Sequence, residues 1–155
     1  VEHWDGTAWR LVPTPATAGS SFLDGVTTGA GAVYAVGEDA TSSGLTPLVL
    51  VDNGGVWQRA ALPAVPSKWV DVYGVAVVGG HADAVGTYVQ PSSGNNVPLL
   101  LTGTGAAGWR IVDGPQPAAG TGNEILGGIA NAGGTTWIAG TFDTGGNNLP
   151  LLQHN

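Results

Sequence analysis

The chain has 155 residues, of which 43% are hydrophobic, so a single domain with a substantial apolar core is possible. Only 10% of the residues are charged, and 27 glycines and 10 prolines interrupt the sequence, which favours strands and turns over long helices. The net charge of −7 argues against nucleic acids and anionic membranes as partners, and the lack of cysteine excludes disulfides and thiol chemistry.

A unit of about fifty residues occurs three times along the chain. Each copy holds a segment with tryptophan, an apolar run around a glycine, a second apolar run that ends in glycine, and a segment that opens with Pro-Leu. In chain order the segments are WDGTAWRLVPTP, FLDGV, VYAVGE and PLVLV; then VWQRAALPAVP, DVYGV, ADAVGT and PLLLT; then GWRIVDGPQP, ILGGI, TWIAGT and PLLQH. Four short apolar segments that recur in a fixed order predict the blades of a β-propeller.

The segments align as the four strands of a blade, with FLDGV and its counterparts as the innermost strand A and the tryptophan segments as the outer strand D. We therefore predict an all-β propeller fold in which residues 4–13 form a D strand, 22–62 and 70–113 form complete blades, and 124–154 form strands A to C. Sheets that pack on both faces have continuously apolar strands, as in PLVLV and YGVAVV. The segments DNGG, GTGAAG and DGTA supply the Gly, Asn and Asp of tight hairpins.

The repeat is out of phase with the chain ends. Residues 1–4 hold the same repeat position as residues 152–155, so the chain opens with a D strand and closes with an unfinished A, B and C. Because propellers close with about four to eight blades, three would leave sheet edges exposed. We therefore expect a homodimer of six blades in which each N-terminal D strand completes the partner's last sheet. The alternative is that the chain is part of a longer propeller.

Four segments of the first repeat, HWDGTAW, LVPTP, LDGV and YAVGE, resemble the repeats of secreted actinobacterial β-propeller proteins, whose units commonly read HWNGTSW, VVPSP, LxGV and VWAVG. The resemblance extends over nearly the whole chain and implies a propeller fold in a secreted, extracellular bacterial protein. It implies no activity, because these proteins are mostly uncharacterised. WDGTAW is also similar to segments of small oligomeric propeller lectins, a resemblance that points to carbohydrate binding.

Catalytic motifs are absent from the sequence. There is no GxSxG or P-loop, and the three histidines lack the spacing of a zinc site. Gly103, Gly105 and Gly108 match a dinucleotide fingerprint, but a strand-like segment follows them instead of a helix, so we interpret them as a hairpin turn. We therefore predict no enzyme, no cofactor and no metal. The longest apolar run is too short to cross a bilayer, so we also predict no membrane insertion.

The best candidates for a binding site lie in or beside the loops from D to A and from B to C, which share one mouth of the predicted propeller. Aromatic rings with a few polar neighbours can stack on a sugar and hydrogen-bond its hydroxyls. The candidates are Trp69, Tyr88 and Phe142 as aromatic groups, and Lys68, Glu38, Asp39, Glu124 and Asp143 as charged groups. We predict a non-catalytic binding module for a glycan or another polar cell-surface ligand.

Two alternatives share the same loops. The first is a structural or protein-interaction scaffold whose partner binds this face. The second is a glycoside-type hydrolase, because that chemistry needs only two carboxylates at a suitable separation, and two of Glu38, Asp39, Glu124 and Asp143 could meet in this way. Trp9, Trp57 and Trp109 recur at one repeat position, and we expect them to pack between blades instead of binding a ligand.

Overall fold

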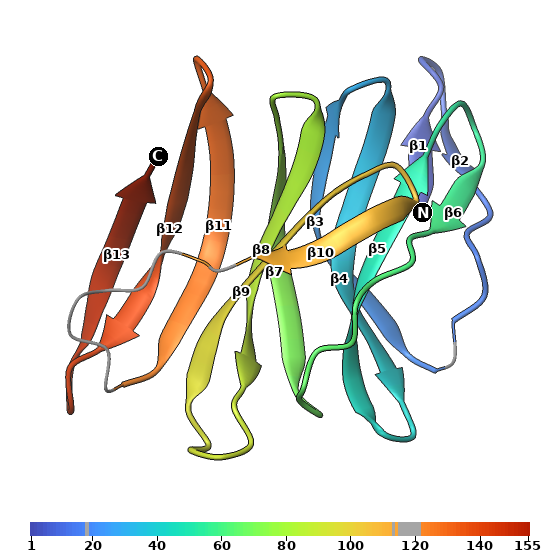
Figure 1. Cartoon of the computed structure of the whole chain (residues 1–155). Helices are drawn as coiled ribbons and strands as arrows, with labels where there is room; N and C mark the ends of the chain where they lie inside the picture. The colour runs from blue at the N-terminus through green and yellow to red at the C-terminus, as the bar shows by residue number, and fades with distance from the viewer. Residues whose placement is uncertain (18, 113, 115–121) are drawn as a thin grey trace.

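The computed structural model describes residues 1–17, 19–112, 114 and 122–155 (Figure 1). Within these residues the fold is all-β, with antiparallel strands in four sheets. No helix among them has the length and apolarity needed to cross a membrane. The strands are β1 (Glu2–Trp4), β2 (Trp9–Leu11), β3 (Ser21–Gly29), β4 (Ala32–Thr41), β5 (Gly44–Asp52), β6 (Trp57–Arg59), β7 (Val70–Val78), β8 (His81–Val89), β9 (Asn96–Thr104), β10 (Ala107–Val112), β11 (Glu124–Ala132), β12 (Thr135–Asp143) and β13 (Asn148–His154).

The strands pair in chain order. Strands β1 and β2 form an N-terminal hairpin, β3 to β6 form sheet 1, β7 to β10 form sheet 2, and β11 to β13 form the three-stranded sheet 3. Figure 1 shows the hairpin and the three sheets side by side in this order, so that each sheet faces the next. The predicted all-β fold with repeated four-stranded antiparallel sheets is confirmed, whereas the closed ring and the dimer stay predictions.

Strand register defines which residues are equivalent between sheets. Val36 in β4 pairs with Val49 in β5, and the same pair recurs as Val85 with Leu100 in sheet 2 and as Ala139 with Leu152 in sheet 3. A glycine follows the second-strand residue of this pair in every sheet, at Gly37, Gly86 and Gly140, and close packing between strands explains why. A Cβ on Gly37, Gly86 or Gly140 would lie 2.0, 1.9 or 2.0 Å from a carbonyl oxygen of the neighbouring first strand. The glycine of VYAVGE, ADAVGT and TWIAGT is therefore a steric requirement of the sheet.

The first strand of each sheet carries a β-bulge at the central glycine of the FLDGV-type segment. The register shifts between Leu23 and Gly25 in β3, and it shifts at the equivalent points of β7 and β11. A bulge inserts one extra residue that has no partner in the ladder. These extra residues are Asp24, Tyr73 and Gly127.

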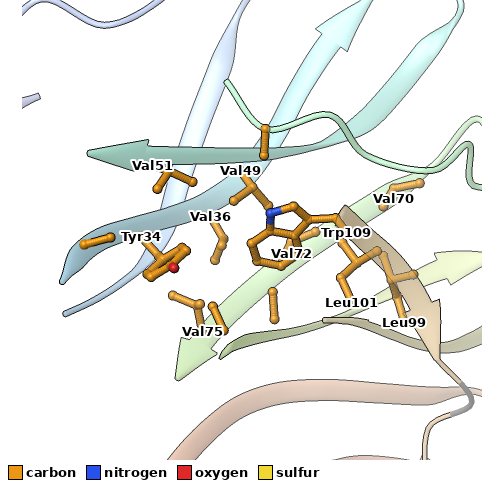
Figure 2. Close-up of a cluster of buried hydrophobic side chains, with 14 residues drawn as sticks. Tyr34, Val36, Val49, Val51, Val70, Val72, Val75, Leu99, Leu101 and Trp109 are labelled. Atoms are coloured by element: carbon orange, nitrogen blue, oxygen red, sulfur yellow. The ribbon is translucent and has the colours of Figure 1, made fainter. Parts of the chain in front are cut away.

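The largest core lies between sheets 1 and 2 (Figure 2). Figure 2 shows the indole of Trp109, from β10, among valines of both sheets and two leucines of sheet 2, with Tyr34 beside it. The two rings meet edge to face with centroids 6.3 Å apart. A second, smaller core joins sheet 3 to sheet 2 through Val85, Leu126, Ile138 and Leu151. Each fully buried aliphatic side chain contributes about 1.5–3 kcal/mol, so face-to-face packing of sheets provides most of the stability.

Two sheet faces lack such a partner. On sheet 1, Val26 is 70% exposed, whereas its equivalent in sheet 2, Val75, is 7% exposed. Val26 and Leu23 line an apolar groove of about 880 Å³ between sheet 1 and the hairpin, which we name the first open face. On sheet 3, Leu152 is 67% exposed although its equivalent Val49 is fully buried. Leu152 and the exposed Trp137 and Ala139 form the second open face.

Candidate functional site

All eight residues selected from the sequence lie at one end of the three sheets. This end, named here the loop end, contains the start of each first strand and the turn between the second and third strands. The register pairs Val70 with Tyr88 and Glu124 with Phe142, which places the first-strand starts beside the second-strand ends. Glu38, Asp39, Tyr88, Phe142 and Asp143 are in the last residues of β4, β8 and β12, whereas Lys68, Trp69 and Glu124 lie before or at the start of β7 and β11.

Trp69 is the most exposed aromatic group among the eight. Its side chain is 61% exposed, while its backbone is held in place at both ends of the residue. The Trp69 N–H donates to Ser67 Oγ at 3.1 Å, and the Trp69 carbonyl accepts from the Val89 N–H at 3.0 Å. The neighbouring Lys68 is exposed, and its carbonyl accepts from the Leu45 N–H at 2.8 Å, which ties this segment to sheet 1. The structure therefore presents an indole on a fixed backbone.

Tyr88, Phe142 and Asp143 are less available to a ligand. The rings of Tyr88 and Phe142 are half-buried and pack against the two inter-sheet cores. Asp143 Oδ1 accepts the N–H groups of Gly145 and Gly146 at 2.8 and 3.0 Å, and these hydrogen bonds lower the Asp143 pKa. Asp143 therefore stabilises the turn between β12 and β13.

Asp39 is only 1% exposed and takes part in an ion pair inside the loop end. Arg59 Nη1 donates to Asp39 Oδ2 at 2.7 Å, and Ser21 Oγ donates to Asp39 Oδ1 at 2.8 Å. These contacts join β3, β4 and β6 across the whole width of sheet 1. A buried carboxylate needs such partners, because removing it from water is costly. The geometry therefore gives Asp39 a structural role in sheet 1.

Glu38 belongs to an acidic cluster that the sequence analysis did not find. Burial, together with the negative charges of Asp24 and Asp71, raises the Glu38 pKa from 4.5 to about 7, although a hydrogen bond from the Val72 backbone offsets part of this effect. Glu38 Oε2 is buried without a hydrogen-bond partner. Burial also raises the pKa of Asp71, which accepts a hydrogen bond from Tyr73. Glu38, Asp24 and Asp71 therefore form a group of interacting carboxyls where β3 and β4 face β7.

The signal for this cluster was present in the sequence at the bulge. Asp24 and Tyr73 are the extra residues of the bulges in β3 and β7, so their side chains leave the regular alternation of the strand. The LDGV and VYGV segments identified these positions, but the proximity of β3 to β7 is a tertiary fact.

Glu124 is buried at the start of β11, and burial raises its pKa. Its Oε1 atom has no hydrogen-bond partner, whereas its backbone carbonyl accepts from Thr87 Oγ1 at 3.2 Å. The charges that raise the Glu38 pKa come from Asp24 and Asp71. Glu124 is not among them, although the sequence analysis considered it as a possible partner of Glu38.

Within residues 1–17, 19–112, 114 and 122–155, no three His, Cys, Asp or Glu side chains come together in a way that could hold a metal ion. No protein-family model matches the sequence, and a search of curated proteins finds no significant match.

Proposed function

We propose that this chain is a non-catalytic binding module that recognises a glycan or another polar cell-surface ligand at the loop end. The observation that carries the proposal is Trp69, an indole that is 61% exposed on a backbone fixed by hydrogen bonds. An aromatic side chain has only two rotatable bonds, so on a fixed backbone it binds a sugar ring with little loss of conformational entropy. An extracellular location, implied by the resemblance of the repeats, belongs to the same proposal.

The polar groups near the loop end suit a neutral, hydroxyl-rich ligand. Lys68 can donate hydrogen bonds, and a Glu38 carboxyl with a pKa of about 7 can donate in its protonated form and accept in its ionised form. The net charge of −7 disfavours strongly anionic ligands. A neutral saccharide is therefore the ligand class that this surface fits best.

A glycan array followed by calorimetry tests the proposal. We expect binding to be lost in Trp69→Ala and unchanged in Trp9→Ala, since Trp9 is similarly exposed but lies on the N-terminal hairpin. Calorimetry reports affinity for each site, so a change in oligomeric state does not imitate a loss of sugar contact. An array that stays silent contradicts glycan recognition. A protein partner whose affinity falls in Trp69→Ala would instead support the scaffold alternative.

We also propose that the three sheets are blades of a β-propeller that two chains close together. The support for this is that both open faces are apolar and hold positions that are buried elsewhere in the chain, as Val26 and Val75 illustrate. Light scattering is the direct measurement, because one chain has a mass of 15.4 kDa and a closed pair has twice that. A monomer at all concentrations contradicts the two-chain ring.

Hydrolysis is the second candidate, and the acidic cluster favours it. A carboxyl with a raised pKa close to a second carboxyl is the arrangement of a glycosidase acid and its partner, and the Glu38 pKa is raised by burial and by the neighbouring Asp24. Chromogenic glycosides provide the assay. Turnover that disappears in both Glu38→Gln and Asp24→Asn would replace the binding proposal with an enzymatic one, and no turnover in the wild type removes this candidate.

A further inference from the structure

The fourth strands of sheets 1 and 2 each bury a tryptophan, Trp57 against Ala35, Leu48 and Leu50 of its own sheet and Trp109 in the core between sheets 1 and 2. Trp57 and Trp109 are 9% and 6% exposed. Trp109 donates from its indole nitrogen to the Gly105 carbonyl at 2.8 Å and packs into the core between sheets 1 and 2. That core includes six residues that have counterparts around sheet 3: Tyr34 and Val49 from sheet 1, and Val75, Ala82, Ala84 and Leu101 from sheet 2.

Sheet 3 has no fourth strand among the described residues, and a cavity of about 260 Å³ lies between it and sheet 2. The strand register shows that this cavity is the counterpart of the Trp109 site. Its lining residues hold the same six repeat positions, with Asp83 and Leu100 from sheet 2 and Ile129, Thr136, Ile138 and Gln153 from sheet 3. The cavity therefore lies where the tryptophan of a fourth strand would pack.

Two polar atoms in the cavity lining support this interpretation independently. Thr136 Oγ1 and Gln153 Oε1 are both buried without a hydrogen-bond partner. Their equivalents in sheet 2 are the apolar Ala82 and Leu101, so the third copy of the repeat places acceptors where the second copy has none. Unpaired buried oxygens are costly, and an indole N–H in the cavity is a donor that they lack.

The chain also carries an unused tryptophan at the matching repeat position. Trp9 pairs with Trp4 in the hairpin just as Trp57 pairs with Asp52 in sheet 1, so Trp9 is the equivalent of Trp57. Trp9 is 66% exposed, and every residue of β1 and β2 is exposed. The hairpin thus holds a fourth strand outside any larger sheet.

We propose that β2 of a second copy of this chain pairs with the edge strand β13 and inserts Trp9 into the 260 Å³ cavity. The inference deepens the proposed two-chain ring and rests on it. The register of sheet 1 predicts the new pairs, in which Leu11 lies opposite Gln153 and Trp9 lies opposite Asn155. The same docking brings the second open face of one copy, with Leu152, against the first open face of the other, with Val26.

This exchange requires β1 to leave β2. Residues 1–4 and 152–155 hold the same repeat position, so only one of them can pair with β2 at a time. The hairpin of β1 and β2 is therefore a closed form that competes with the exchanged form. It is held by three residue pairs, by the contact of Trp4 with Trp9, and by an ion pair of 2.7 Å between Asp5 and Arg10.

Two engineered disulfides distinguish the forms, because the chain has no cysteine of its own. The hydrogen bond from the Val12 N–H to the Val1 carbonyl makes the adjacent pair, Glu2 with Leu11, a non-hydrogen-bonded pair whose side chains lie close enough to bridge. In the exchanged form Leu11 faces Gln153 of the other copy. We expect oxidised Leu11→Cys/Gln153→Cys protein to run as a covalent dimer in a denaturing gel. The Glu2→Cys/Leu11→Cys protein should close within one chain and stay monomeric in light scattering.

Light scattering on single variants provides the second readout. We expect Trp9→Ala to weaken association by at least about 30-fold, as for a buried aromatic hot spot, and Trp69→Ala to leave association unchanged. If the chain dimerises with full affinity in Trp9→Ala and in the hairpin-locked double cysteine protein, the strand exchange is overturned while the two-chain ring survives. A wild-type chain that stays monomeric overturns both. Loss of sugar binding in Trp69→Ala alone bears on the binding function and leaves the exchange intact.

Discussion

Replacing Glu38 with glutamine should make the stability of this protein less dependent on pH. Burial and the charges of Asp24 and Asp71 raise the Glu38 pKa from 4.5 to about 7 in the folded state. Between these two values the unfolded chain releases the proton and the folded chain keeps it, so the free energy of unfolding falls as pH rises from 4.5 to about 7 and then levels off. Glutamine carries no charge at any pH, and Glu38→Gln escapes this loss.

The size of the effect follows from the pKa difference. A rise of the Glu38 pKa from 4.5 to about 7 corresponds to a loss of about 3 kcal/mol in the free energy of unfolding once the carboxyl is fully ionised. Because Glu38 is only partly buried, solvent screening reduces this to about 1–2 kcal/mol. We therefore expect Glu38→Gln and wild type to have equal stability at about pH 4, and the variant to be more stable by about 1–2 kcal/mol at about pH 8.

Urea unfolding at a series of pH values, followed by tryptophan fluorescence, measures this difference. Burial also raises the pKa of Asp71 and Glu124, so both proteins lose stability with pH and only the difference between their curves reports on Glu38. Glu2→Gln is the matched control, because it removes one carboxylate from the exposed strand β1. A difference curve that stays flat, or a Glu38 carboxyl-carbon NMR titration with its midpoint near 4.5, would refute the reasoning.

Three further predictions concern stability and are checked by chemical unfolding. Trp109→Ala should cost about 3–5 kcal/mol because it leaves a cavity in the largest core, while Val56→Ala, at an exposed site, should change stability by less than about 0.5 kcal/mol. Arg59→Met should cost about 3 kcal/mol, because Asp39 keeps its buried charge and loses the guanidinium at 2.7 Å; a loss below about 1 kcal/mol would show that the pair is not needed. Gly86→Ala should cost about 1–3 kcal/mol or more, because its Cβ would meet a carbonyl oxygen at 1.9 Å, and an unchanged unfolding midpoint would contradict the predicted clash.

The strand order and the packing of each sheet could be predicted from the sequence because the repeat states them three times. Leu48, Val49 and Leu50 are consecutive apolar residues of β5 that are buried on alternate faces, which is the pattern expected for a sheet covered on both sides. Packing between sheets, which was expected for the recurrent tryptophans, is confirmed for Trp109, whereas Trp57 packs against residues of its own sheet. Trp9 differs, because the hairpin that carries it lies outside the larger sheets.

The candidate site could be predicted from the sequence only in part. The position of each selected residue at the loop end follows from the strand order, so the grouping could be predicted. The interactions of those residues could not, because they join separate strands or sheets. Asp39 is paired with Arg59 from β6, and Glu38 interacts with Asp71 from β7.

The amino-acid sequence by itself determined the local rules of this protein, since hydrophobic pattern, turn residues and required glycines act over a few neighbouring positions and recur with each repeat. The tertiary structure decided which faces and sites have partners. Val75 is buried and Val26 is exposed although they hold equivalent repeat positions. Likewise, the site that Trp109 fills between sheets 1 and 2 has a cavity beside Gln153 as its counterpart between sheets 2 and 3. The repeat by itself does not predict these differences. The physical reason is that burial depends on the sheet lying opposite, and sheets 1 and 3 each have one face with no sheet of three or four strands opposite it among the described residues.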